Sequence, residues 1–239
     1  MLAGISERIG YDTPDRRRFL TRIIPPPANP LHKTDFFLNL LAAINVPSDG
    51  RVPDFFSDPE MEKTFLNRRR EWGIGNGEPY AVVHPGGNWD LKRWPAALFI
   101  EWIRIFRKEY PWKIFLCGTE SEKLITDTIM REFSTDAVIS LCGQTNLGEL
   151  ALLLKGAKFL LSNDSGPIHL AASQKTKIIG LFGPTSPDLT GPISDASVEI
   201  LRKDVGCEVP CYFRSCHYRV CMDWITPQEV LEKARGLLL

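Results

Sequence analysis

The chain is predicted to form an α/β fold with a doubly wound parallel sheet, and three observations predict it. Short apolar runs alternate with amphipathic stretches from Tyr80 onward. Glycine-containing turns directly follow several of these apolar runs. The chain has 239 residues, of which 44% are hydrophobic and 24% charged, as in globular proteins. Apolar runs that alternate with helices are typical of a parallel sheet with helices on both faces.

Residues 1–77 precede this alternation and differ from it. The prolines at 25–27 favour a stiff extended segment, because proline supplies no backbone donor and fixes its own φ. Apolar residues recur at helical spacing over 31–45, which predicts a helix. A second, charged helix is expected over 60–72, and the glycines in 73–77 end it. This region therefore has the character of a connector.

The second region, 78–225, contains the alternating elements. Strands are expected at 80–83, 113–116, 138–141, 158–162, 178–182 and 198–201. Helices are expected between them at 96–107, 120–133, 147–154 and 167–173. In such sheets a ligand binds outside the carboxyl ends of the strands, so the loops at those ends are the candidate site.

The block LLSNDSGPIHLAA (160–172) is typical of a phosphate-binding turn. Ser165 can cap the following helix, Gly166 permits a backbone conformation closed to other residues, and Pro167 suits a first helical turn. Free amides and the positive end of the helix dipole would then point beyond the strand. Asp164 and His169 flank that point and can bind sugar hydroxyls and phosphate oxygens. The alternative is an ordinary strand-to-helix loop with a capping serine and a packed histidine.

A second block, HPGGNWDLKRWP (84–95), follows the expected strand at 80–83. Gly86 and Gly87 would let the backbone approach a ligand closely, and Lys92 and Arg93 add positive charge a few residues later. The block is neither the G-x-G-x-x-G dinucleotide fingerprint nor a Walker loop. Together with the first block, it predicts a site for a phosphorylated ligand.

Six segments carry a resemblance to a known family. They are AGISERIGY, LHKTDFFLNLLAAINVP, HPGGNWDLKRWP, LCGTESEK, CGQTNLGELALLLKGAKFLLSNDSGPIHLAA and LFGPTSPDLTGP. In this order and spacing, the last four resemble the carboxyl-terminal donor-binding domain of family 9 glycosyltransferases, the lipopolysaccharide heptosyltransferases. The resemblance covers nearly the whole chain. It implies the C-terminal, Rossmann-like half of a GT-B architecture with two domains.

The resemblance also implies a domain assignment. Residues 1–77 would be the remnant of the N-terminal acceptor domain and the connector, and 78–225 the nucleotide-sugar domain. Residues 226–239 would form a helix that returns to the domain junction, begun by a cap, a first-turn proline and a glutamate. Its apolar face, which this chain is expected to leave partly exposed, consists of Val230, Leu231, Ala234, Leu237 and Leu238.

The implied N-terminal domain is largely missing from these 239 residues. The Gly-Asp loop whose aspartate the family is thought to use as general base has no counterpart near residue 1. The chain alone is therefore expected to be inactive. A misassigned start, a truncated gene, a trimmed chain and a separate completing polypeptide would each account for this.

The function implied by the resemblance is transfer of heptose from an ADP-activated donor to a lipopolysaccharide core acceptor. Gly86, Gly87 and Lys92 would hold one side of the donor diphosphate, while Ser165 and Gly166 hold the other. Lys92 and His169 would stabilise the leaving group, so neither a metal nor another cofactor is required.

The other roles also follow from matched positions. Glu122 would bind the nucleotide ribose, although without the resemblance it reads as a helix-start carboxylate that stabilises the dipole. Thr145 falls in the base pocket, where the family often has an apolar or sulfur-containing side chain, so base identity rests on the resemblance and adenine is expected. Asp164 would bind hydroxyls of the transferred sugar. Residues 183–185 are expected to be turn-shaping.

Charge and hydropathy limit the classes of partner that the chain is expected to bind. Lys and Arg balance Asp and Glu at 29 each, which gives no indication of nucleic-acid binding. No apolar stretch approaches the length of a membrane span, and the first residues lack a signal peptide's apolar core. A cytoplasmic protein is expected, with at most peripheral contact to the inner membrane. The arginine triplets at 16–18 and 68–70 could touch acceptor phosphates, but such triplets are usually solvated helix faces.

Four of the six cysteines are close in sequence: Cys207, Cys211, Cys216 and Cys221. Their spacing fits no paired C-x-x-C knuckle, although a tetrahedral thiolate cluster is conceivable. A structural metal or a redox cross-link is weighed against reduced, partly buried thiols, and the thiols are favoured.

Two other functions stay open. One is a nucleotide-sugar-binding remnant or subunit without catalysis, which the absent Gly-Asp loop favours. The other is a GT-B-like nucleotide-sugar epimerase, which the block SNDSGPIHLAA disfavours.

Overall fold

The computed structural model describes residues 4–134, 136–213 and 215–239. The chain forms two compact units. The first comprises the residues up to Arg51 together with Asp188–Thr190, and the second comprises Val52–Pro187 and Gly191–Leu239.

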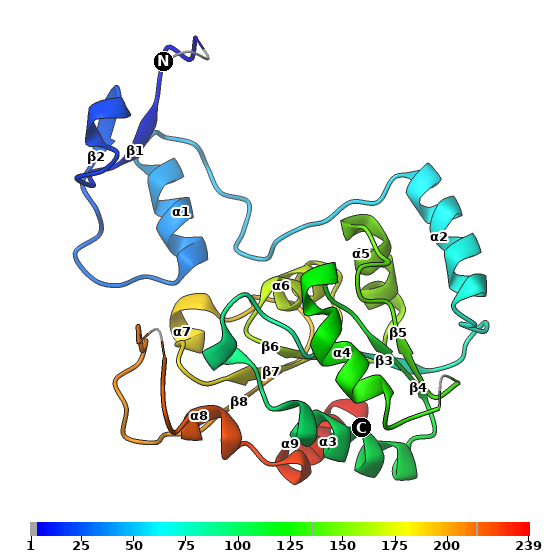
Figure 1. Ribbon diagram of the computed structural model, residues 1–239. Helices are drawn as coiled ribbons and strands as arrows, with labels where there is room; N and C mark the ends of the chain where they lie inside the picture. Colours follow the sequence, from blue (N-terminus) through cyan, green and yellow to red (C-terminus); the bar gives the residue numbers. More distant parts are fainter. Residues whose placement is uncertain (1–3, 135, 214) are drawn as a thin grey trace. The chain divides into compact units, whose positions relative to one another are not determined.

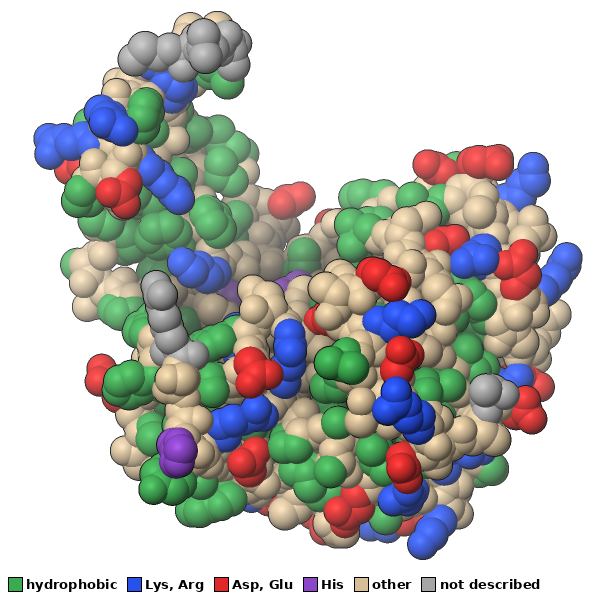
Figure 2. Space-filling model, viewed as in Figure 1, with side chains coloured by type: hydrophobic (Ala, Val, Ile, Leu, Met, Phe, Trp, Pro, Cys, Tyr) green, Lys and Arg blue, Asp and Glu red, His purple; other side chains and the backbone are tan. Residues whose placement is uncertain are grey.

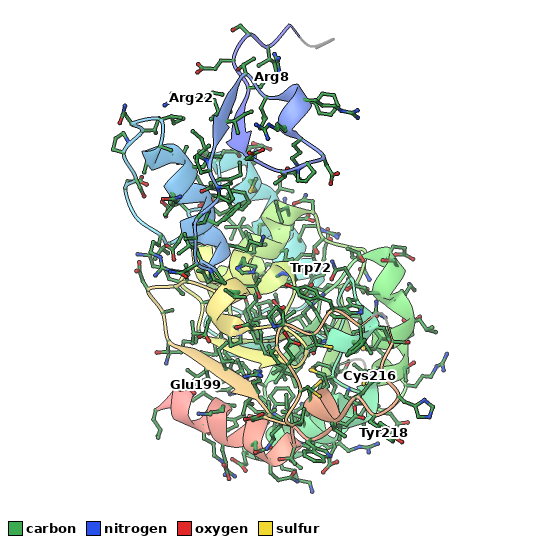
Figure 3. The ribbon with its side chains drawn as sticks, turned by 90° about the vertical axis from the view of Figure 1, so that its left-hand side faces the viewer. Arg8, Arg22, Trp72, Glu199, Cys216 and Tyr218 are labelled. Atoms are coloured by element: carbon green, nitrogen blue, oxygen red, sulfur yellow. The ribbon has the colours of Figure 1, made fainter. Side chains whose placement is uncertain are left out.

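The first unit contains a small parallel sheet and a helix. Its elements are β1 (Ile9–Tyr11), a 3₁₀ turn (Arg17–Phe19), β2 (Arg22–Ile24) and α1 (Lys33–Ala42). The buried Tyr11 joins the sheet to the helix, because its hydroxyl donates to the Phe36 carbonyl at 2.6 Å and its ring contacts the Phe36 ring. The helix expected over 31–45 is confirmed with shorter ends. Arg8 and Arg22 lie in this unit (Figure 3).

The second unit is built on a six-stranded sheet in which every neighbouring pair is parallel. Its strands are β3 (Tyr80–His84), β4 (Lys113–Leu116), β5 (Val138–Ser140), β6 (Leu160–Asn163), β7 (Ile178–Phe182) and β8 (Val198–Arg202). The spatial order is β5-β4-β3-β6-β7-β8. The chain therefore winds outward in one direction from β3 and in the other from β6. The predicted doubly wound α/β class is confirmed, and its topological switch point lies between β3 and β6.

Helices cover both faces of this sheet (Figure 1). They are α2 (Pro59–Glu71), α3 (Ala96–Glu109), α4 (Lys123–Met130), α5 (Leu147–Gly156), α6 (Gly166–Ser173), α8 (Val220–Asp223) and α9 (Pro227–Leu238), while α7 (Pro187–Thr190) follows β7. Alternate residues of β3 enter the two layers, because successive side chains of a strand point to opposite faces. Ala81 and Val83 pack with α3, α4 and α9, whereas Tyr80 and Val82 pack with α2, α5 and α6.

The ends of several helices follow from capping residues. Asn146 and Glu149 form a capping box at α5, and Thr226 and Glu229 form the one expected at α9. The helix expected over 120–133 instead begins with a 3₁₀ turn, Glu120–Glu122, that a third capping box joins to Thr119.

One expectation about α9 is wrong. Val230 and Ala234 are fully buried and Leu231 and Leu237 nearly so, because α9 packs against α3, β7 and β8 within the second unit. The apolar face assigned to the domain junction is therefore part of this unit's own core.

The surface carries both signs of charge. Figure 2 shows basic and acidic side chains interspersed on the viewed face. Two arginines of α2 bind their own unit, because Arg68 contacts Glu71 and Glu149 and Arg69 donates to the Gly75 carbonyl. Among the described residues, no helix combines the length and apolar character that crossing a membrane requires.

Candidate functional site

The two sequence blocks singled out above lie side by side at the switch point. His84 ends β3 and pairs in register with Ser162 on β6, so the loops that follow leave the same edge of the sheet. Parallel strands place their carboxyl ends together, which is where doubly wound folds bind ligands. The structure thus brings together the blocks at 84–95 and 160–172.

Asn163 fastens the block at 84–95 to the end of β6. Its side chain is fully buried, its Nδ2 donates to the carbonyls of Pro85 and Gly86 at 2.9 Å each, and its Oδ1 accepts from the Trp94 amide at 3.0 Å. Two donors and one acceptor are what a neutral amide offers and a carboxylate does not. We did not predict this role from the sequence, although a polar residue that ends a fully buried strand is a signal for it.

Gly86 is required for a reason that differs from the one expected. A Cβ placed on Gly86 would lie 2.0 Å from Glu122 Oε1, so a side chain at this position would displace the Glu122 carboxylate from its hydrogen bonds. Gly87 has a φ of 156°, which residues with side chains rarely adopt.

Replacing Gly86 by alanine should therefore destabilise the protein through Glu122. Overpacking of this kind costs about 1–3 kcal/mol of unfolding free energy. In a double-mutant cycle with Glu122→Ala, measured by urea unfolding, the coupling between the two positions should be about 0.5–3 kcal/mol, because the shorter side chain removes the clash. Strictly additive effects would show that the two groups do not meet.

Glu122 links the loops that follow β3 and β4. Its Oε1 accepts from the Gly87 amide at 2.6 Å and lies 3.4 Å from His84 Nε2. Its Oε2 accepts from the amide and the hydroxyl of Thr119, at 2.7 and 2.9 Å. The hydrogen bond from His84, assisted by those from Thr119, lowers the pKa of Glu122 from its usual 4.5 to about 2, against the opposing effect of burial.

A dependence of stability on pH follows from this shift. A carboxyl group whose pKa is lower in the folded chain stabilises it above the unfolded pKa, and that contribution is lost as the pH falls. The unfolding free energy should therefore contain a contribution from Glu122 that is complete above pH 4.5 and disappears toward pH 2. Urea unfolding across this range should show that the unfolding free energy changes less with pH in Glu122→Gln than in wild type. The exposed control Glu208→Gln should keep the wild-type dependence on pH. Equal slopes in wild type and Glu122→Gln would contradict the assignment.

Lys92 and Asp164 form a largely buried ion pair that joins the blocks at 84–95 and 160–172. Lys92 Nζ lies 2.8 Å from Asp164 Oδ2, and the Asp164 side chain is 5% exposed. Thr185, which the sequence treated as a turn-shaping residue, donates its hydroxyl to the same oxygen at 2.7 Å. The remaining carboxylate oxygen, Oδ1, is the one that these two bonds leave for a ligand.

The start of α6 differs in detail from the expectation. Ser165 occupies the cap position, but it makes no capping hydrogen bond among the described residues. Gly166 does not adopt the left-handed conformation that motivated its assignment, and a Cβ there would meet open space. The glycine therefore leaves room in front of the helix rather than relieving backbone strain. His169 lies on α6 with an exposed side chain.

A cavity of about 920 Å³ opens between these elements. Five of the residues assigned to the donor site line it: Gly87, Glu122, Thr145, Ser165 and Gly166. Gly86, Lys92, Asp164 and His169 lie in adjoining positions of the same loops and helix but are not among the lining residues.

The cavity also contains residues that sequence reasoning did not assign. His84 and Arg93 line it, and the Arg93 guanidinium folds back to donate to the Gly87 carbonyl from both Nε and Nη2. Leu147, Leu150 and Leu170 supply an apolar part of the wall. Polar groups that converge beside an apolar wall are typical of a small-molecule site.

The clustered cysteines lie elsewhere in the second unit. Cys207, Cys211, Cys216 and Cys221 are free thiols that line one small cavity of about 50 Å³ next to α8, and Figure 3 shows Cys216 there near Tyr218. Burial raises the pKa of Cys221, and the three neighbouring thiols raise it further. Within the described residues, no three His, Cys, Asp or Glu side chains are arranged to hold a metal ion. Cys117 and Cys142 are buried, as expected at strand ends.

The chain is similar to a known protein family and to several of its members. The family described as glycosyltransferase family 9 (heptosyltransferase) matches residues 1–219. The chain belongs to this family. Lipooligosaccharide heptosyltransferase 2 of Campylobacter jejuni is 30% identical over 171 residues, which cover 69% of this chain and 53% of the relative. The same-named protein of Haemophilus ducreyi is 33% identical over 208 residues, covering 82% and 60%. The chain thus spans about half the length of the curated relatives it matches.

Solved structures agree with the fold of this family 9 chain. The E. coli ADP-heptose lipopolysaccharide heptosyltransferase II matches with a TM-score of 0.78 and 24% identity, covering 99% of this chain and 71% of that one. A family 9 glycosyltransferase from Veillonella parvula matches with a TM-score of 0.80 and 20% identity, covering 98% and 68%. At these identities the likeness shows the fold, and it agrees with the GT-B-like architecture that the sequence predicted.

Proposed function

We propose that this chain is the donor-binding half of a heptosyltransferase that takes heptose from an ADP-activated donor. The observation that carries the proposal is the cavity at the switch point, which is lined both by the turn after β3 and by the start of α6. A helix start with room in front of it suits a phosphate group, because its free amides and dipole favour an anion. Its family and the names of its relatives support heptose as the transferred sugar.

Each part of the donor has a group to bind it. The diphosphate would lie between the turn of Gly86 and Gly87, with Lys92, on one side and Ser165 and Gly166 on the other. When the donor binds, the Gly87 amide would exchange its hydrogen bond to Glu122 for one to a phosphate oxygen. Glu122 would then accept hydrogen bonds from the ribose hydroxyls. The base would lie near Thr145, and adenine is the base we propose.

The reaction would be a displacement at the anomeric carbon. The acceptor hydroxyl oxygen forms a bond to this carbon while the bond to the diphosphate oxygen breaks, and ADP leaves with the electron pair. The hydroxyl proton goes to a general base, for which residues 1–239 offer no match to the family's Gly-Asp loop. Lys92, His169 and the α6 dipole would stabilise the charge that grows on the diphosphate.

Donor binding is accordingly the property proposed for this chain by itself, and transfer is not expected of it alone. For the whole protein we propose the lipopolysaccharide core as acceptor, by the names of the relatives. Contact with a membrane that holds this acceptor would be peripheral.

The proposal is tested by comparing ADP-heptose with ADP in calorimetric titrations. Asp164 would bind the sugar, so wild type should bind ADP-heptose more tightly than ADP. Asp164→Asn should weaken the binding of ADP-heptose by about 10-fold or more, which is the contribution of a charged hydrogen bond. It should change the binding of ADP much less. The exposed Asp195→Asn is the matched control. Equal affinity of wild type for the two ligands would contradict a heptose-donor site.

A further inference from the structure

His84 occupies a position in the site that none of the roles above explains. The residue ends β3, its side chain is 2% exposed, and it lines the cavity. Its Nδ1 lies 3.3 Å from the hydroxyl of Ser162 on the neighbouring strand, and its Nε2 lies 3.4 Å from Glu122 Oε1. The ring thus lies between the floor of the sheet and the carboxylate proposed to bind ribose.

The surrounding groups show which atom of His84 donates to Glu122. The Ser162 hydroxyl donates to the Asn163 carbonyl at 2.7 Å, so its oxygen can accept from Nδ1 of the ring. An ionised carboxylate only accepts, so Nε2 must also carry a hydrogen to bond Glu122. The ring thus meets the Ser162 hydroxyl on its Nδ1 side and the Glu122 carboxylate on its Nε2 side.

The other charged and titratable groups near this pair come from the adjoining loops. The Arg93 guanidinium is bound to the Gly87 carbonyl, and Glu120 lies on the same 3₁₀ turn as Glu122. The thiols of Cys117 and Cys142 lie nearby; burial raises the pKa of both, and the Glu122 charge raises it further. Neither thiol carries the hydrogen that Glu122 Oε1 accepts.

The Glu122 carboxylate is fixed from opposite sides. Thr119 bonds Oε2, while the Gly87 amide and His84 both approach Oε1. If the Gly87 amide turns to a phosphate when a donor binds, His84 is the partner that still holds Oε1. Because His84 would keep its contact with Glu122 while the donor binds, it can set the direction in which the Glu122 carboxylate meets the ribose.

We propose that His84 is a positioning residue for donor recognition, which holds the Glu122 carboxylate directed at the ribose hydroxyls of a nucleoside diphosphate. This inference rests on the proposed function, because it needs a nucleotide in the cavity. It adds a residue that acts through Glu122 and does not itself touch the donor.

The test compares ADP with 2′,3′-dideoxy-ADP, which lacks the hydroxyls that Glu122 would bind. Wild type should prefer ADP by about 10-fold to 100-fold, as expected for hydrogen bonds to a charged group. His84→Leu should remove this preference by weakening ADP while leaving the dideoxy compound within about 2-fold. His84→Gln, whose amide can still donate to Glu122, should restore most of it, and the exposed His217→Leu should change nothing. Equal weakening of both nucleotides by His84→Leu would indicate a merely structural role and overturn the proposal.

A second measurement separates this inference from the proposed function. If wild type binds no ADP, the proposed function fails, and the side-chain carboxyl carbon of Glu122 can still be followed by NMR without nucleotide. In His84→Leu the pKa of Glu122 should rise toward its ordinary value, and in His84→Gln it should rise less. An unchanged pKa in His84→Leu would overturn the positioning role.

Discussion

Replacing Asn163 by aspartate is expected to lower the unfolding free energy by about 3–5 kcal/mol. The variant loses both donors to the Pro85 and Gly86 carbonyls. It also places a carboxylate against these two carbonyls at a site with no exposure to water. Each buried polar group left without a partner costs about 1–3 kcal/mol, and here two carbonyls and a charge are affected.

Urea unfolding of Asn163→Asp measures this effect. Asn146→Asp is the matched control, because the Asn146 side chain only accepts a hydrogen bond, from the Glu149 amide at the start of α5. Aspartate caps a helix as well as asparagine does, so this variant should stay close to wild type. A loss below about 1 kcal/mol for Asn163→Asp would show that the amide does not fasten the two loops.

The largest expected effect on ligand binding comes from Lys92. Replacing it by methionine should weaken ADP by about 10-fold to 100-fold, because a charged donor to the diphosphate is lost. The affinity of the wild type for ADP should fall at high salt, because salt screens the charge of Lys92. The affinity of the variant for ADP should be nearly independent of salt. The exposed Lys155→Met, which removes the same charge from α5, is the control for net charge.

Loss of Lys92 also leaves the Asp164 carboxylate buried with Thr185 as its remaining partner, which destabilises the fold by about 3–5 kcal/mol. The double variant Lys92→Met with Asp164→Asn removes both charges and should recover much of this stability. If the double variant also regained wild-type affinity for ADP, Lys92 would act on folding alone and not on the diphosphate.

The centre of the sheet was predictable from the sequence because β3, β6 and β7 are fully buried. A strand covered on both faces is a continuous apolar run, and YAVV and IIGLF stand out as such. The 3₁₀ turn of Glu120–Glu122 was not predictable, because it depends on the Glu122 side chain returning to the Thr119 backbone. The burial of α9 was missed for another reason. An apolar helix face does not state which element covers it, and here α3 does.

The candidate site was predictable in its location but less so in its internal contacts. The blocks ending β3 and β6 identify the edge of the sheet, because turn residues after apolar strands are a local signal. The partnership of Gly86 with Glu122 joins residues 36 positions apart, and that of Asn163 with Pro85 joins residues 78 apart. Contacts of this kind are set by the strand order, which local patterns do not reveal. His84 and Asn163 therefore received no role from the sequence.

The central claim is that the cavity between the ends of β3 and β6 binds an adenine nucleoside diphosphate, and a calorimetric titration of this chain with ADP, UDP and GDP tests it most directly. We expect ADP to bind at one site per chain, UDP and GDP to bind more weakly, and Lys92→Met to weaken ADP binding by about 10-fold to 100-fold. A folded chain that binds none of the three, or that binds UDP most tightly, would contradict it.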